Sequence, residues 1–264
     1  MLTLTKLYSL LDEYAPFEIS REIIKAGGYD NSGIIIKEHE NINKILFALD
    51  LSVDAVKRAK RLGCDTIITH HPAIYNPINS LDYQDANTGA ILLATKYGMN
   101  VISMHLNLDF APLGIDYYLA DALGGKGAKI LEQSGEKVGY GREFCLNKTT
   151  LKEFVSKVNT SVNSNKNLSY GSANFVFNKV ASFCGGGSSH ALKALQNGLT
   201  DANVIVTSDI PHHVIKEFID RGVALVIPTH YAAENYGFNK FYEWVSATLG
   251  GEIQAYYFDD KRYL

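Results

Sequence analysis

Residues 44–71 read KILFALDLSVDAVKRAKRLGCDTIITHH, and this stretch already indicates a fold class. The apolar run 44–51 predicts a buried strand, and 66–69 predicts the next one. Between them, 52–63 has apolar residues at helical spacing, a serine that can cap the first turn and a glycine that can end the last. Strands that are apolar throughout and are joined by a helix are typical of a parallel sheet covered by helices on both faces.

The same alternation continues along the chain. Further strands are predicted over 100–105, 179–184, 203–208 and 224–229, and further helices over 88–99, 114–125, 150–163, 212–222 and 231–249. A glycine-rich, charged stretch at 124–144 interrupts the rhythm and indicates a domain boundary. The sequence therefore predicts an α/β protein of two domains, with largely parallel sheets covered by helices. One domain is discontinuous, 1–125 plus 230–264, and the other is 126–229.

The composition is that of a globular protein with no strongly charged partner. The chain has 264 residues, 46% of them apolar and 20% charged, which is enough for a stable core without disulfides. A net charge of -3 and a pI near 6.2 exclude an electrostatic case for nucleic acid or an anionic membrane. Neither partner is expected.

The cysteines and the first residues indicate a cytoplasmic protein. Cys64, Cys145 and Cys184 are far apart and odd in number, so we interpret them as buried free thiols in a reducing compartment. The first sixteen residues carry charges and leucines at helical spacing in place of the apolar core of a signal peptide. No apolar run reaches membrane-spanning length.

Three predicted strands end in residues that commonly bind metals. These residues are His70 and His71 after the strand 66–69, His105 and Asp109 in HLNLD, and His230 and Glu234 in HYAAE after the strand 224–229. In open parallel sheets, ligands bind beyond the carboxyl ends of the strands. The convergence of three strand ends therefore predicts a site.

The residue types indicate the class of metal. Imidazole and carboxylate ligands suit zinc, iron, manganese or nickel, and no cysteine lies near these motifs in the sequence. The set exceeds what one catalytic ion needs, and it can hold two ions if a carboxylate bridges. His230 and Glu234 are four apart and share a face if they enter a helix. A turn at His70-His71, which Pro72 favours, would let each imidazole reach a different ion.

Each of these residues also has an ordinary interpretation. A histidine at a strand end is often only hydrogen-bonded, so His105 can support the ligands instead of binding the metal. Asp109 can be the N-cap of a following helix. His212 and His213 can be a solvated helix start.

Two further motifs lie at strand ends in the second half of the chain. In CGGGSS (184–189), Gly186 and Gly187 can cradle an anion at a helix N-terminus, or they can simply allow a tight turn. The motif is neither GxGxxG nor a P-loop. In TSDIPHH, Asp209 and His213 can contact a substrate or support the metal ligands.

Taken in order, these motifs resemble the Nif-three-like family, the dinuclear-metal proteins known as GTP cyclohydrolase 1 type 2 homologues. The resemblance rests on THHPAIYNPINSL, HLNLDFAPLGIDYYLADALG and THYAAEN, supported by YDNSGIII, GYGREF, CGGGSS and TSDIPHH. It covers nearly the whole chain. The chain is too short for the regulatory-like domain that is inserted in many members.

The resemblance implies a ligand set and an assembly. One ion would be held by His71 and Asp109, the other by His70 and His230, with Glu234 bridging both. Two interlocked α/β domains and a homo-oligomer, often a toroidal hexamer, are also implied. The chain departs from the family at Leu106 and Thr229, which removes no ligand but can reshape the pocket.

The sequence thus predicts a cytoplasmic protein with two divalent ions per chain that hydrolyses a nucleotide or a phosphorylated small molecule. A cyclohydrolase reaction on GTP is implied only by the resemblance. The alternatives are a non-catalytic, metal-binding oligomeric scaffold that binds a protein partner, and nucleotide binding without chemistry. Open coordination positions on each ion favour catalysis.

Overall fold

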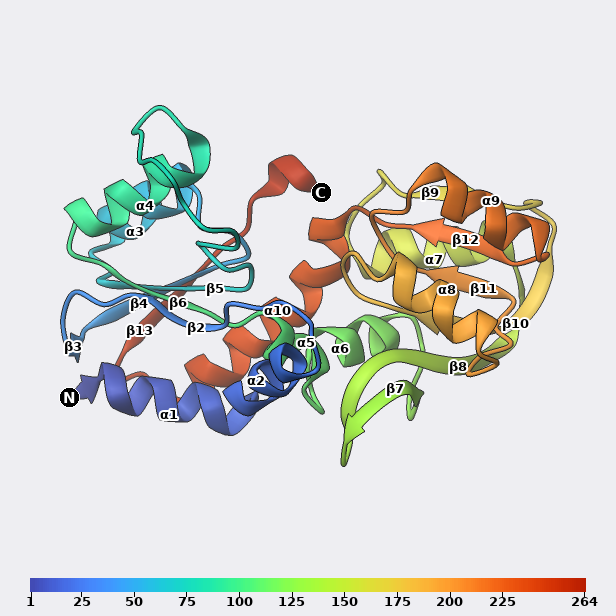
Figure 1. Ribbon diagram of the computed structural model, residues 1–264, viewed down its shortest axis with the longest axis horizontal. Coiled ribbons are helices and arrows are strands. Elements are labelled where there is room, and N and C mark those ends of the chain that lie inside the picture. Colours follow the sequence, from blue (N-terminus) through green and yellow to red (C-terminus); the bar gives the residue numbers. More distant parts are fainter. The chain divides into compact units, whose positions relative to one another are not determined.

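The computed structural model describes residues 1–264, and the chain forms two compact units (Figure 1). Unit 1 comprises 1–108 and 238–260, and unit 2 comprises 109–237 and 261–264. Two elements cross the division, α5 (Leu106–Phe110) and α10 (His230–Thr248). The predicted boundaries, 125/126 and 229/230, lie elsewhere in the chain.

Contacts of α6 (Ile115–Ala122) and of the start of α10 account for the difference in boundaries. The Asp116 carboxylate in α6 accepts a hydrogen bond from the Cys184 backbone N–H at 3.1 Å. It also lies 3.6 Å from the guanidinium of Arg142. In α10, a Cβ added to Gly237 would lie 2.8 Å from the Ile115 Cα, so the two backbones pack closely there. These segments therefore belong with unit 2.

Unit 1 is built on a five-stranded sheet in the order β13-β4-β5-β6-β2. Its strands are β2 (Gly33–Ile36), β4 (Lys44–Ala48), β5 (Thr66–Thr69), β6 (Asn100–Ser103) and β13 (Gln254–Phe258), with a separate pair of β1 (Leu2–Thr3) and β3 (Asn41–Ile42). Its helices are α1 (Leu4–Tyr14), α2 (Phe17–Lys25), α3 (Val53–Leu62) and α4 (Ala86–Lys96), together with the later turns of α10. Only β2 is antiparallel to its neighbour.

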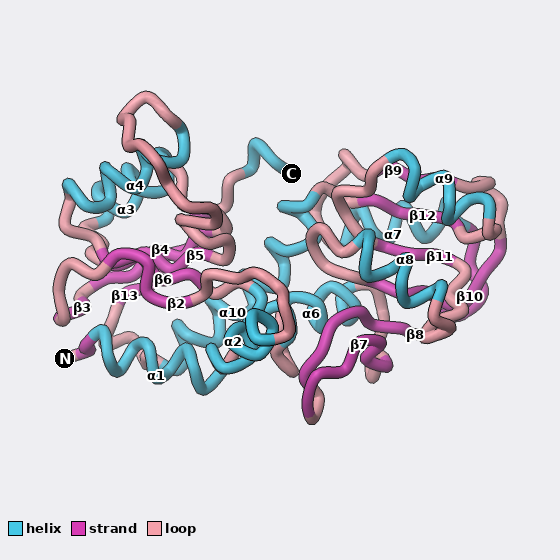
Figure 2. Tube along the Cα trace, in the orientation of Figure 1, coloured by secondary structure: helices cyan, strands magenta, loops and turns pink.

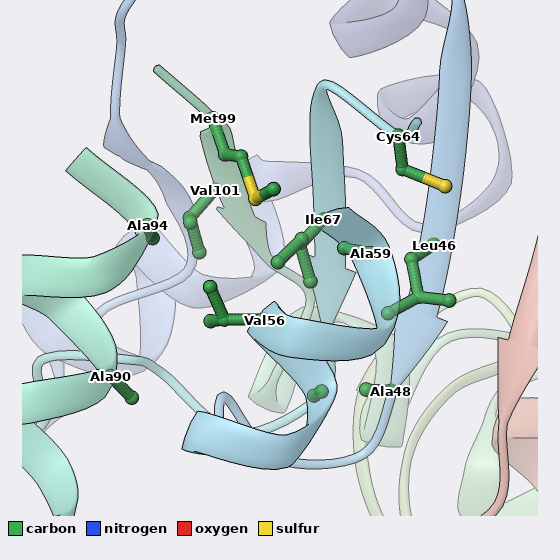
Figure 3. Close-up of a cluster of buried hydrophobic side chains, with 11 residues drawn as sticks. Leu46, Ala48, Val56, Ala59, Cys64, Ile67, Ala90, Ala94, Met99 and Val101 are labelled. Atoms are coloured by element: carbon green, nitrogen blue, oxygen red, sulfur yellow. The ribbon is translucent and has the colours of Figure 1, made fainter. Parts of the chain in front are cut away.

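Alternate residues of β4 point to opposite faces of this sheet, and both faces are covered. Leu46 and Ala48 are buried in a cluster with α3 and α4, which also includes Val56 and Ile67 (Figure 3). Phe47 points the other way, and its ring centroid lies 5.9 Å from that of Phe241 in α10. This burial on both faces explains why the strand is apolar throughout.

Unit 2 is built on a six-stranded sheet in the order β7-β8-β10-β11-β12-β9. Its strands are β7 (Lys129–Gly135), β8 (Val138–Thr150), β9 (Leu168–Tyr170), β10 (Val176–Ser182), β11 (Val204–Val206) and β12 (Ala224–Ile227). The helices α7 (Leu151–Ser161), α8 (Ser188–Gln196) and α9 (His212–Asp220) accompany α6, and the 3-10 turn Lys261–Tyr263 ends the unit. In the tube view the helices are cyan and the strands are magenta (Figure 2).

The α/β class is confirmed, but the second sheet is mixed and contains elements that the sequence pattern did not predict. β10, β11 and β12 run parallel, whereas β7, β8 and β9 pair antiparallel. β7 and β8 form a hairpin that begins in the stretch 124–144, where the sequence predicts a boundary, and continues to Thr150. Glycine obscures the strand pattern there: Gly141 has φ of 72°, and a Cβ on it would lie 2.3 Å from the Phe183 ring.

The parallel strands of each sheet position the polar motifs. The residues that follow β4, β5 and β6 come from the carboxyl ends of neighbouring parallel strands in unit 1. Those that follow β10, β11 and β12 do the same in unit 2. No helix is both long enough and apolar enough to cross a membrane.

Candidate metal site

The carboxyl edge of the unit 1 sheet gathers three histidines and two aspartates. Asp50, His70, His71 and His105 follow β4, β5 and β6 by one or two residues. β2 runs antiparallel and pairs Gly33 with Ser103, so the segment before it reaches the same edge and delivers Asp30. Strand direction therefore brings these residues together from four segments of the chain.

The three histidines form a compact set, named here the histidine group: His70, His71 and His105. Their candidate ligand atoms lie within 4.8 Å of one another, close enough to hold a metal ion. In each ring, Nδ1 lies 2.7 Å from an oxygen, and these oxygens belong in turn to Met104, Asp50 and Asp30.

These contacts fix the tautomer of each ring. The Met104 carbonyl and the two carboxylates accept hydrogen bonds, so Nδ1 carries the hydrogen and donates it. Nε2 is then the nitrogen whose lone pair can bind a metal, which is the usual arrangement of a metal-binding histidine. His105, which the sequence left open between ligand and support, therefore has the same preparation as His70 and His71.

Asp30 is held as a carboxylate by these interactions. Its side chain is fully buried, and burial by itself would raise its pKa. The hydrogen bond and charge of His105, with hydrogen bonds from Ser20 and Ser32, outweigh burial and lower the pKa to about 2. Asp30 therefore stays a hydrogen-bond acceptor for His105 near neutral pH.

The unit 2 sheet presents a second group at its own carboxyl edge. Cys184, Asp209 and His230 follow β10, β11 and β12. His230 begins α10, and Glu234 lies one turn later on the same face, as the spacing predicted. The Glu234 side chain is buried, whereas that of His230 is one-third exposed.

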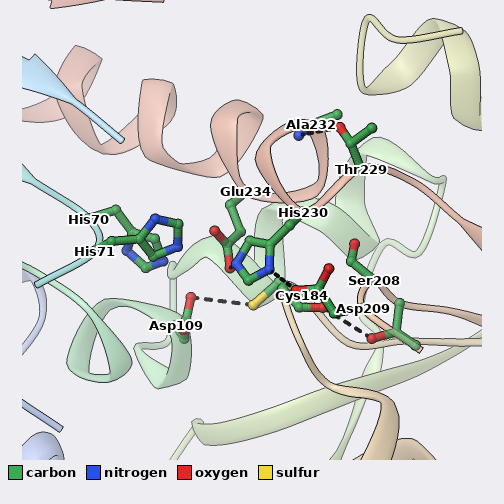
Figure 4. A network of polar contacts seen from close by, with 12 residues as sticks. His70, His71, Asp109, Cys184, Ser208, Asp209, Thr229, His230, Ala232 and Glu234 are labelled. Carbon is green, nitrogen blue, oxygen red and sulfur yellow. Dashed lines mark hydrogen bonds and ion pairs between the residues drawn. The ribbon is translucent and has the colours of Figure 1, made fainter. Parts of the chain in front are cut away.

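The Nδ1 of His230 faces an oxygen acceptor, as in the histidine group. This acceptor is the Asp209 carboxylate, and the Nε2 of His230 lies 3.0 Å from Glu234 Oε1 (Figure 4). With its hydrogen on Nδ1, the ring presents a lone pair to a carboxylate oxygen, and two acceptors at this distance need a proton or a metal cation beside them. This arrangement fits a metal site.

Asp109 lies in α5 and accepts a hydrogen bond from Cys184. The Cys184 thiol donates to Asp109 Oδ1 at 3.3 Å (Figure 4), and both residues are buried. Burial, with the carboxylates of Asp109, Asp116 and Glu234 nearby, raises the pKa of this thiol well above its usual range. Cys184 is therefore a neutral donor to Asp109, and the fold brings a thiol to the site that its sequence position did not reveal.

The glycine loop after β10 makes room for the candidate ligands. Gly185 has φ of 56°, and a Cβ there would lie 2.2 Å from Glu234 Oε1 and 3.3 Å from His230 Nε2. A Cβ on Gly187 would lie 2.5 Å from the Tyr140 hydroxyl. Close approach of side chains, the simpler of the two interpretations of CGGGSS, thus accounts for these glycines.

The Asp209 carboxylate lies beside the glycine loop, at the position that an anion would take in the other interpretation of CGGGSS. A Cβ on Gly186 would lie 3.7 Å from Asp209 Oδ2, and the Ser188 hydroxyl donates to the Asp209 carbonyl oxygen at 3.4 Å. A phosphate at the start of α8 would therefore be repelled by Asp209. His213 is exposed in the first turn of α9.

Sequence reasoning singled out the histidines but missed some of the residues that orient them. Asp50 lies inside the strand predicted over 44–51, so the rule that located His70 at a strand end did not point to it; the observed strand β4 ends earlier, at Ala48. Asp30 precedes an edge strand that was not predicted. The sequence indicated Gly186 and Gly187 and not Gly185, because only the packed structure shows which glycine faces Glu234.

Comparisons with known proteins give one consistent result for the sequence. The family model Duf34/NIF3 (NGG1p interacting factor 3) matches residues 2–261. A Clostridium perfringens protein named GTP cyclohydrolase 1 type 2 homolog is 28% identical over 256 residues, covering 95% of this chain and 94% of its own length.

Solved structures have the same fold. A Bacillus cereus protein related to NIF3 superposes with a TM-score of 0.86 at 19% identity, covering 97% of this chain and 96% of its own. Reduced HcgD from Methanocaldococcus jannaschii superposes with a TM-score of 0.77 at 24% identity, covering 97% of this chain and 98% of its own. At these identities the likeness extends to the fold alone.

Proposed function

This chain belongs to the Duf34/NIF3 family, and from the preparation of its histidines we propose that it is a metal-dependent hydrolase. The proposed ligands are His70, His71, Asp109, His230 and Glu234. The observation that carries the proposal is that each of these three imidazoles donates Nδ1–H to a fixed acceptor, so that Nε2 is the metal-binding atom.

The donor set supports divalent ions such as zinc, iron, manganese or nickel. Three imidazoles and two carboxylates are borderline to hard ligands, which these metals accept. Five ligands are more than one catalytic ion uses, so we place two ions on them, with Glu234 shared. When bound, such ions would polarise the substrate and lower the pKa of a metal-bound water toward neutrality.

The protein's own groups would orient and hold this ligand set. Asp209 and Asp50 accept hydrogen bonds from Nδ1–H of His230 and His71, so neither ring has to rotate when a metal binds. The Cys184 thiol fixes one oxygen of Asp109. Gly185 allows the Glu234 carboxylate to lie against the loop. Such supporting contacts are as much part of a metal site as its ligands.

For the substrate, we propose a nucleotide or a phosphorylated small molecule. GTP is the first compound to test, because relatives of this chain are named GTP cyclohydrolase 1 type 2 homologs. Because Asp209 lies at the start of α8, we expect the phosphate of such a substrate to bind away from that helix. His213→Ala should then change the apparent affinity little.

The test is hydrolysis of a nucleotide and phosphoester panel by the metal-loaded chain, before and after chelation. We expect turnover that needs a divalent metal and is lost in Asp109→Asn. Asp121→Asn, a change in the neighbouring helix α6, is the control and should retain turnover. Failure with GTP alone would remove only the cyclohydrolase reaction.

The alternative of a binding scaffold is an outcome of the same experiment. If the metal-loaded chain turns over nothing in the panel and no compound raises its melting temperature, the hydrolase proposal is wrong. Stoichiometric capture of one identified protein partner, dependent on the same ligands, would then favour the scaffold.

A further inference from the structure

A cleft of about 630 Å³ lies beside His71 in unit 1, and we name it the His71 cleft. It is lined by many of the residues between His71 and Ile91, together with Asp50 and Leu51. Its volume is in the range of small-molecule sites. Because His71 is both a proposed metal ligand and part of this wall, a molecule in the cleft would lie next to the site.

The wall of the cleft is fixed from behind. The Asn31 side-chain amide donates to the Ile74 carbonyl at 2.6 Å, and the Tyr29 hydroxyl donates to the carbonyl of Tyr75. Further along, the Asp85 carboxylate accepts from the Thr88 backbone N–H at 2.7 Å and caps α4. These hydrogen bonds hold the lining segment at Ile74 and Tyr75 and at the start of α4.

The charge of the lining excludes an anion. Three carboxylates line the cleft, those of Asp50, Asp82 and Asp85, and no lysine or arginine does. The imidazole of His71 is already paired with Asp50. In the cleft a phosphate would face carboxylates with no lysine or arginine to offset them, whereas a group that carries N–H donors would find acceptors.

Tyr75 adds an aromatic surface between the cleft and the histidine group. Tyr75 lines the cleft and is 45% exposed. Its ring meets the Tyr29 ring edge-on at 5.0 Å and the His105 ring at 6.0 Å. These contacts fix the ring while leaving part of it uncovered, which suits stacking with a flat ligand.

We propose that the His71 cleft binds a flat, uncharged nitrogen heterocycle, stacked on Tyr75 with its N–H groups toward Asp82 and Asp85. The phosphate of a substrate lies outside this cleft. Tyr75 is thus the residue that selects the ring. The inference rests on the proposed function only in taking the ring to be the part of the substrate that reaches His71.

The experiment measures binding of guanosine, adenosine and cytidine to the full, metal-loaded chain by calorimetry. We expect at least one nucleoside to bind, Tyr75→Ala to weaken that binding about tenfold or more, and Tyr75→Phe to retain it. Sulfate, which carries no ring, should not displace the nucleoside. Tyr83→Ala is the matched control, because Tyr83 belongs to the same segment and is 57% exposed but does not line the cleft.

The proposal is overturned if no nucleoside binds at millimolar concentration, if sulfate competes, or if Tyr75→Ala binds as tightly as the parent. Circular dichroism and metal content of each variant show whether the fold and the metal site are intact. Failure of the two proposals can be told apart. Tyr75-dependent binding by a chain that holds no metal would contradict only the metal-dependent hydrolase, and metal-dependent turnover without any nucleoside binding would contradict only the cleft.

Discussion

At the scale of single residues, the site histidines share one device. His71, His105 and His230 each give their Nδ1–H to an aspartate, and His70 gives it to the Met104 carbonyl. An imidazole bound in this way cannot rotate or change tautomer without losing a hydrogen bond. The supporting residues should therefore affect metal affinity without being ligands.

The first prediction concerns Asp209. Asp209→Asn should lower metal affinity by about 10- to 100-fold, because the amide holds the His230 ring less firmly and makes Nε2 less basic. Metal titration of the chelated chain measures the change. The control is Asp201→Asn, which removes an exposed carboxylate paired with Lys179 and should leave affinity unchanged. Equal affinity in both variants would contradict the role of Asp209.

The second prediction concerns Gly185. Gly185→Ala should weaken metal binding, because the added Cβ would lie 2.2 Å from Glu234 Oε1 and must displace that carboxylate. Gly198→Ala is the matched control. Gly198 has a similar positive φ of 67° but no atom within 4 Å of the added Cβ, so it shares the backbone strain without the collision. Similar metal affinities in the two variants would mean that the Glu234 carboxylate is not a ligand.

At the scale of elements, helix α10 connects stability with the site. Its first turn carries His230 and Glu234, and its later turns pack Phe238 and Phe241 into the core of unit 1. The Thr229 hydroxyl accepts from the Ala232 backbone N–H at 3.2 Å and so caps the helix. Thr229, a departure from the family pattern, thus serves as the N-cap of α10.

The third prediction uses this cap. Thr229→Ala should lower stability by about 1 kcal/mol and also weaken metal binding, because the first turn of α10 frays. Thr150→Ala removes the N-cap of α7, which carries no site residue, and should lower stability by a similar amount with metal affinity retained. Thermal melts and metal titrations of both variants give the comparison. Unchanged metal affinity in Thr229→Ala would show that the cap does not order the site.

At the scale of the whole molecule, the fourth prediction concerns the number of metal ions bound by each chain. Protein purified without chelator should carry close to two transition-metal ions per chain. Glu234→Gln should weaken both ions together, because it removes the charge that they share, whereas His71→Ala should mainly weaken one. Elemental analysis gives the counts. A value near one that added zinc or manganese does not change would rule out the pair.

The fifth prediction concerns assembly. We expect a homo-oligomer larger than a dimer, and a hexamer by resemblance to the family. The aromatic stretch 236–245 does not supply an independent argument for assembly, because Phe238, Phe241 and Val245 are fully buried within the chain. The prediction therefore rests on the resemblance. Light scattering at micromolar concentration would contradict it by showing a monomer.

The sequence by itself determined the α/β class and the strand ends that carry His70, His71 and His230, because buried parallel strands are apolar throughout and polar residues must follow where they end. Spacing alone also placed His230 and Glu234 on one helix face. Tertiary structure decided what periodicity cannot encode. Strand order brought Asp30 and Asp50 to the histidines, and the fold of unit 2 brought Cys184 to Asp109. Likewise, only packing shows that Gly185 faces Glu234, and glycines such as Gly141 mask the strand pattern of the β7–β8 hairpin. Contacts between distant segments depend on register and close approach, which local sequence does not record.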